Sequence, residues 1–155
     1  MKTYFDSAVL VKAYCLENTT GEALALIKRA VPPLLFTSLH ALEIRNALRL
    51  KRYRKELTES QLRGALRFLQ DDIESGFLMT PAHSLEEVFS RAEALSAENT
   101  ATIGVRSLDI LHVAGALILG AGEFVSFDKR QRSLAAKAGL KVLPRILPRA
   151  MRGPR

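Results

Sequence analysis

Four acidic residues stand at positions where a carboxylate is costly or unusual. Asp6 and Asp128 each follow a short apolar run, and Asp109 directly precedes residues 110–114, which are apolar except for His112. Glu43 lies among apolar positions of a helical pattern. Burying carboxylates together costs free energy unless a cation compensates them. Because hard oxygen ligands suit Mg²⁺ or Mn²⁺, the pattern predicts a metal site that can activate water for phosphodiester hydrolysis.

Simpler roles are open for three of these acids. Asp6 and Asp128 precede helical patterns, and aspartate is a preferred N-cap. Asp109 opens a helical segment, where a negative charge interacts favourably with the helix dipole. Glu43 is harder to explain, because at about 100° per residue it lies nearly opposite the arginines of its own helix. An acid on that face is directed toward the core or a cleft.

The elements that must position these acids alternate along the chain. Apolar runs predict strands over 2–5, 34–37, 76–79, 123–126 and 141–143. Helical spacing predicts one helix directly after Asp6 and others over 21–30, 39–54, 59–74, 84–98, 108–119 and 129–138, with Ser84 as an N-cap. The stretch 99–104 is predicted to be a loop. This alternation predicts one α/β domain with a parallel or mostly parallel sheet covered by helices on both faces.

Charge is unevenly distributed along the 155 residues, which carry a net charge of +7. Residues 45–67 hold eight basic and two acidic side chains, residues 68–98 hold seven acidic and one basic, and residues 129–155 hold nine basic and none acidic. This segregation indicates a polyanionic partner, with Arg45, Arg49 and Arg52 as candidate nucleic-acid contacts. An ordinary solvated helix face is the other interpretation of such a charge run.

The composition also excludes several classes of protein. The single Cys15 excludes a disulfide framework and a cluster of thiolate ligands, which is typical of a reducing, cytoplasmic setting. A charge at Lys2 interrupts any apolar leader, and the apolar stretch 113–122 is too short to cross a bilayer. We therefore expect a cytoplasmic protein with no membrane partner.

Residues 4–7 (Tyr-Phe-Asp-Ser), Glu43 in an early helix, and residues 107–116 followed by 124–128 form a recognisable pattern. This pattern resembles the PIN domain, and VapC-type toxins in particular. The similarity covers residues 2–143, and the stretch 107–142 is the part whose pattern is specific to this family. The resemblance implies a three-layer α/β/α sandwich with a mostly parallel central sheet. The nuclease domain would span residues 1–143, and a basic C-terminal tail would span 144–155.

The resemblance also implies an activity. A PIN domain of this type is a Mg²⁺- or Mn²⁺-dependent endoribonuclease, and VapC-type members form homodimers that bind a small antitoxin in the same cleft. By position, the catalytic and metal-ligating residues are Asp6, Glu43, Asp109 and Asp128. Ser7, beside Asp6, and Ser126, where the family usually has Thr, are expected to support the site.

Two other functions are open. A non-catalytic RNA-binding or regulatory module could keep this fold, although loss of an acid would be its mark. A metal-dependent phosphatase on an α/β sheet would act on small phosphate esters and not on RNA.

His112 is interpreted as a core histidine satisfied by a neighbour, and Cys15 as a small residue of the first helix.

Overall fold

The computed structural model describes residues 1–151. In this part of the chain the strands are short and all pair in parallel. One sheet has the order β1 (Thr3–Phe5), β4 (Glu123–Val125), β5 (Lys141–Leu143). A second pairs β2 (Leu34–Leu35) with β3 (Leu78–Met79). The two sheets adjoin through contacts between β1 and β2.

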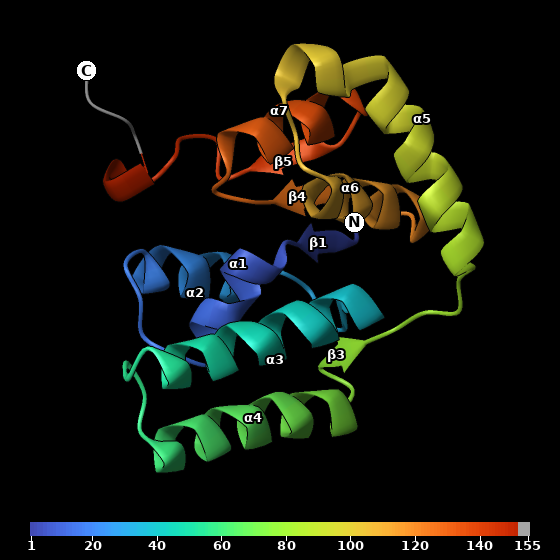
Figure 1. The fold of residues 1–155 in the computed structure, drawn as a ribbon. Coiled ribbons are helices and arrows are strands. Elements are labelled where there is room, and N and C mark those ends of the chain that lie inside the picture. The colour runs from blue at the N-terminus through green and yellow to red at the C-terminus, as the bar shows by residue number, and fades with distance from the viewer. Residues whose placement is uncertain (152–155) are drawn as a thin grey trace.

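Helices cover both faces of this strand layer (Figure 1). They are α1 (Ser7–Leu10), α2 (Thr20–Arg29), α3 (Ser38–Tyr53), α4 (Glu59–Glu74), α5 (Leu85–Ile103), α6 (Ser107–Ile118) and α7 (Lys129–Lys137), with a 3₁₀ turn η1 (Val11–Ala13) after α1. Tyr4 and Phe124 pack with α5, α6 and α7, whereas the next residues, Phe5 and Val125, pack with the first four helices. Successive strand residues therefore face two separate cores, which confirms the three-layer α/β/α architecture.

The strand order brings two predicted site acids to one place. From β1 the chain passes to β2 and β3 on one side, and β4 and β5 lie on the other side. Asp6 follows β1, and Asp128 comes soon after β4, so both lie beyond the carboxyl ends of neighbouring parallel strands. In open α/β sheets, ligands bind where the order of the strands reverses in this way.

The predicted loop over 99–104 is wrong. Helix α5 continues to Ile103, and Gly104, with φ +70°, ends it. Asn99 is buried and its side-chain amide donates to Leu95 O, while the Thr102 hydroxyl donates to Asn99 O. The polar side chains that favour a loop in isolation are thus satisfied along the helix, and packing of α5 on α6 overrides their low helix propensity.

The C-terminal segment is fixed to the sheet by the partly buried side chain of Arg132. The Arg132 guanidinium on α7 donates to Ser126 O and Leu143 O, both at 2.9 Å, and to Pro144 O at 2.7 Å. A short 3₁₀ turn, η2 (Arg149–Met151), follows. Of the predicted tail 144–155, residues 152–155 lie outside the described residues. No helix in the described part of the chain is long and apolar enough to span a membrane.

Helix α3 offers a matched test of this packing. Leu48 is fully buried between α3 and its neighbours, whereas Leu42 on the same helix is 66% exposed. We expect Leu48→Ala to lower the free energy of unfolding by about 2–5 kcal/mol and Leu42→Ala by less than about 0.5 kcal/mol. Urea unfolding followed by circular dichroism measures both, and equal losses would contradict the assigned buried face of α3.

Candidate active site

Asp6 and Asp128 are both N-caps, as the simpler interpretation predicted. Asp6 Oδ1 accepts a hydrogen bond from Val9 N at 2.8 Å, and Asp128 Oδ1 accepts one from Gln131 N, also at 2.8 Å. Asp6 is 4% exposed, whereas Asp128 is on the surface. Capping uses one oxygen of each carboxylate, so it fixes the side chain and leaves acceptor capacity for a ligand.

The surroundings of Asp6 act on its charge in opposite directions. Burial raises the pKa of the carboxyl, and the nearby Asp109 charge raises it further. A hydrogen bond from Ser126, the charge of His112 and the Val9 N–H lower it, but the pKa remains above its ordinary value. A cation beside Asp6 would offset both the desolvation and the repulsion.

Glu43 points from α3 toward the end of β1. Its Oε1 accepts a hydrogen bond from the Ser7 hydroxyl at 3.0 Å and contacts Nε2 of His112. Burial raises the pKa of Glu43, but the hydrogen bonds from His112 and Ser7 and the His112 charge lower it more, so the pKa lies below its ordinary value. Glu43 is therefore held ionised and oriented by two residues from other elements.

His112 is buried and satisfied by a neighbour, as interpreted from the sequence, but it also reaches the site. Its Nδ1 lies 3.0 Å from the Tyr4 hydroxyl, whose pKa burial raises so far that it stays protonated. The Tyr4 hydroxyl and Nδ1 thus share a hydrogen bond on one side of the ring, and Nε2 faces Glu43 on the other side. A Cβ at Gly115 would lie 3.3 Å from the Tyr4 hydroxyl, so glycine keeps this position open.

A second buried histidine supports the end of β1. His40 accepts a hydrogen bond from Thr37 N at Nδ1 and donates from Nε2 to Phe5 O at 2.7 Å. Burial, followed by the charge of His112, lowers the pKa of His40 to about 3, so the ring is neutral at pH 7. His40 thereby ties α3 to the carbonyl that precedes Asp6. Sequence reasoning missed this role, and the position of His40 at N3 of a helix after Thr37 was its only signal.

Asp109 brings an arginine to the site that sequence reasoning also missed. Arg106 Nε lies 3.0 Å from Asp109 Oδ2, and the Arg106 side chain is 76% exposed. The hydrogen bond and the charge of Asp109 raise the pKa of Arg106, and the charges of Asp128 and Glu43 add to this. Arg106 thus lies within electrostatic reach of three of the four predicted acids. Its position three residues before Asp109, at the start of α6, was the available signal.

Gln131 connects the segments that carry the last two acids. Besides its backbone bond to Asp128, its Nε2 donates to the Asp109 carbonyl at 3.4 Å. The Gln131 side chain is buried, and its Oε1 has no hydrogen-bond partner within the part of the chain described here. The start of α7 is therefore held against the start of α6.

The arginines of α3 lie elsewhere. Arg45 donates to Gln70 of α4 at 3.2 Å, and Arg52 pairs with Glu59 of α4 at 3.3 Å, while Arg49 is exposed. The contacts of Glu43 with Ser7 and His112 are on the other face of α3. The structure thus brings the four acids and both serines toward one region and leaves these arginines outside it.

The donor chemistry of the site fits a hard divalent cation, because all four candidate ligands are carboxylates. Within residues 1–151, however, no group of three or more His, Cys, Asp or Glu side chains is arranged so that it could hold a metal ion. Asp109 bonds to Arg106, and Glu43 bonds to His112. Coordination by several of these acids therefore requires side-chain rotation, which is open to the partly exposed Asp109 and Glu43 more than to buried Asp6.

The contact between His112 and Glu43 generates a prediction. The pKa of Glu43 in the folded chain lies below its ordinary value of 4.5, so its contribution to stability is present above about pH 4.5 and lost as the pH falls through the lowered pKa. We expect His112→Asn to raise the pKa of Glu43, since burial remains and the principal hydrogen bond is gone. A carboxyl ¹³C NMR titration measures this shift. His83→Asn, at a histidine bonded to Pro81 O, is the control and should leave Glu43 unchanged.

Comparison with known proteins gives this fold and site a family. A comparison with curated proteins finds no match. The PIN domain family matches residues 3–137, which include all four predicted acids. PIN domains are generally metal-dependent nucleases. The match covers most of the chain, and the protein therefore belongs to the PIN domain family.

Proposed function

We propose that this chain is an endoribonuclease that hydrolyses RNA phosphodiester bonds with Mg²⁺ or Mn²⁺ held by Asp6, Glu43, Asp109 and Asp128. The observation that carries the proposal is the placement of Asp6 and Asp128 beyond the carboxyl ends of the neighbouring strands β1 and β4, with Glu43 of α3 hydrogen-bonded to Ser7, the residue after Asp6. Asp109 acts on Asp6, and Arg106 is influenced by Asp109, Asp128 and Glu43. Family membership and the carboxylate chemistry support the nuclease assignment.

Each residue has a separate part in this proposal. A bound divalent cation would supply a water of lowered pKa and would stabilise charge on the leaving oxygen. Asp6 is the fixed anchor, because burial and its N-cap bond restrict it. Glu43 is kept ionised at neutral pH, so it can accept a proton at a carboxylate oxygen. Ser126 holds both Asp6 and the backbone N–H of Asp128, the latter at 3.0 Å.

Arg106 is proposed as the contact for a substrate phosphate. Its guanidinium is exposed and lies against Asp109 rather than in the core. Arginine recognises phosphate oxygens through two parallel donors, which fits the approach of an RNA backbone to the acids. In this arrangement Arg106 also competes with a metal ion for Asp109.

We further propose that the protein is the toxin of a VapBC-type pair. The resemblance of residues 4–7 and 107–128 to VapC-type toxins supports this, and it brings a homodimer, a small antitoxin and a cytoplasmic location as expectations. The antitoxin proposal is independent of the nuclease proposal. A short open reading frame directly upstream would support the antitoxin proposal and would not test the nuclease proposal.

Neutralising the acids tests the nuclease. We expect Asp6→Asn and Asp109→Asn each to lower Mn²⁺-dependent cleavage of a structured RNA by more than the 10- to 100-fold loss typical of residues around a metal site. Cleavage of end-labelled RNA, with and without EDTA, measures the rate. Asp71→Asn, on the exposed surface of α4, is the matched control.

Activity that survives both site substitutions would overturn the proposal. Activity on small phosphate esters but not on RNA would favour a phosphatase instead. RNA binding with no cleavage under any metal would favour the non-catalytic module.

The pairing of Arg106 with Asp109 generates a further prediction. Arg106→Gln should tighten Mn²⁺ binding, because Asp109 loses its competing cation, and should weaken RNA binding with a smaller salt dependence. If Arg45, Arg49 and Arg52 contact RNA, their joint replacement by alanine lowers the salt slope but leaves Mn²⁺ affinity unchanged. Calorimetry with Mn²⁺ and fluorescence anisotropy with RNA separate the two effects. If the variant that lacks Arg45, Arg49 and Arg52 bound Mn²⁺ more tightly, the role of Arg106 as the competitor for Asp109 would be contradicted.

A further inference from the structure

A pocket of about 460 Å³ lies against the sheet, between α2 and the segment that follows β5. Its lining includes Thr3, Glu123 and Lys141, the first residues of β1, β4 and β5. Asp6 and Asp128 come after the last residues of β1 and β4, at the opposite end of the strands. The lining continues along the strands to Val125 and Leu143, the last residues of β4 and β5, but it includes none of the four predicted acids. The pocket is therefore distinct from the candidate active site.

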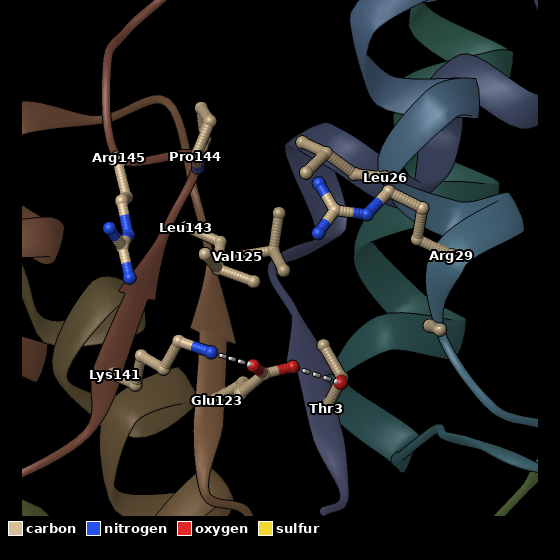
Figure 2. Close-up of a pocket in the computed structure, with 10 residues that line it drawn as sticks. Thr3, Leu26, Arg29, Glu123, Val125, Lys141, Leu143, Pro144 and Arg145 are labelled. Carbon is tan, nitrogen blue, oxygen red and sulfur yellow. Dashed lines mark hydrogen bonds and ion pairs between the residues drawn. The ribbon is translucent and has the colours of Figure 1, made fainter.

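Two arginines stand on opposite sides of an apolar floor in this pocket. Figure 2 shows Arg29 of α2 on one side and Arg145 on the other, with Leu143 between them above Val125, which is only 1% exposed. Both arginines are exposed, and no carboxylate pairs with either of them among residues 1–151. An apolar floor between two free guanidinium groups suits a ligand with a flat apolar body and anionic groups.

The wall that carries Arg145 is held by the fold. Arg132 donates to the carbonyls of Leu143 and Pro144, which are the two residues before Arg145. On the other side, Arg29 belongs to the last turn of α2, and Ala23 and Ile27 anchor that helix in the core. The spacing of the two arginines is thus set by ordered elements.

Besides the arginines and the apolar floor, the pocket contains the carboxylate of Glu123. Glu123 accepts hydrogen bonds from Lys141 Nζ at 2.7 Å and from the Thr3 hydroxyl at 2.9 Å (Figure 2). Each carboxylate oxygen can accept a further bond, so Glu123 can also receive an amine or hydroxyl of a ligand. With Arg29, Arg145 and Lys141 against Glu123, the lining carries a net positive charge.

We propose that this pocket binds a nucleotide. Phosphate groups would pair with Arg29 and Arg145, the base would lie against the partly exposed Leu26 and Leu143, and a ribose hydroxyl or base amine would donate to Glu123. A simple anion leaves the apolar floor unused, and an aliphatic acid offers no donor to Glu123. The nucleotide is either free or part of an RNA strand. The proposal does not rest on nuclease activity, because the test measures binding without metal.

The test uses the full chain in EDTA with N-methylanthraniloyl-ADP as a fluorescent probe. We expect saturable binding that weakens about tenfold in Arg29→Ala and in Arg145→Ala, and further in the double variant. Arg91→Ala, at an exposed arginine of α5, is the charge-matched control and should bind as the unchanged chain does. Thermal unfolding of each variant checks that the fold is retained. Equal binding by all variants would overturn the proposal.

Competition then identifies the ligand. AMP and ADP should displace the probe, and pyrophosphate should do so at least tenfold less well. A 5′-phosphorylated RNA trinucleotide that competes better than AMP identifies an RNA strand as the source, and equal competition identifies the free nucleotide. Pyrophosphate that competes as well as ADP would overturn the nucleotide assignment.

Discussion

The hydrogen bonds that reach Glu43 join the two halves of the molecule. Glu43 belongs to α3, in the half formed by the first four helices, whereas His112 belongs to α6, in the other half. The chain of contacts from Tyr4 through His112 to Glu43 and Ser7 crosses the strand layer near the end of β1. A half-buried carboxylate is stable here only because donors from both halves meet it. The site therefore forms only when the two cores are packed together.

The sequence could predict the acids and the elements because these depend on local pattern. Helix α4 begins and ends where helical spacing predicts, and its capping box of Thr58 and Gln61 is local as well. Asp6 and Asp128 were recognisable because each is placed between a strand and a helix. The end of α5 was not predictable, because the helix extends through Asn99 only by packing on α6. Local propensity carries no information about that contact.

The partners of the acids were harder to predict for the same reason. Arg106 is close in sequence to Asp109, but its influence on Glu43 and Asp128 exists only in the folded chain. Tyr4 and His112 are 108 residues apart, and each reads as an ordinary core residue when considered singly. The sequence also showed only in part how the basic residues are used on the surface. Lys51 pairs with Glu17 and Glu56, so part of the basic excess forms ion pairs within the protein.

Arg132 illustrates a different use of positive charge. Its guanidinium has no carboxylate partner among the contacts seen in residues 1–151 and instead donates to three carbonyl oxygens, that of Ser126 and those of the consecutive residues Leu143 and Pro144. Burial lowers its pKa, but a guanidinium stays protonated, so the charge is permanent. A lysine ammonium is a compact point charge and could not reproduce the planar, divergent donors. We therefore expect natural variation among the surface arginines around it, while position 132 accepts arginine alone.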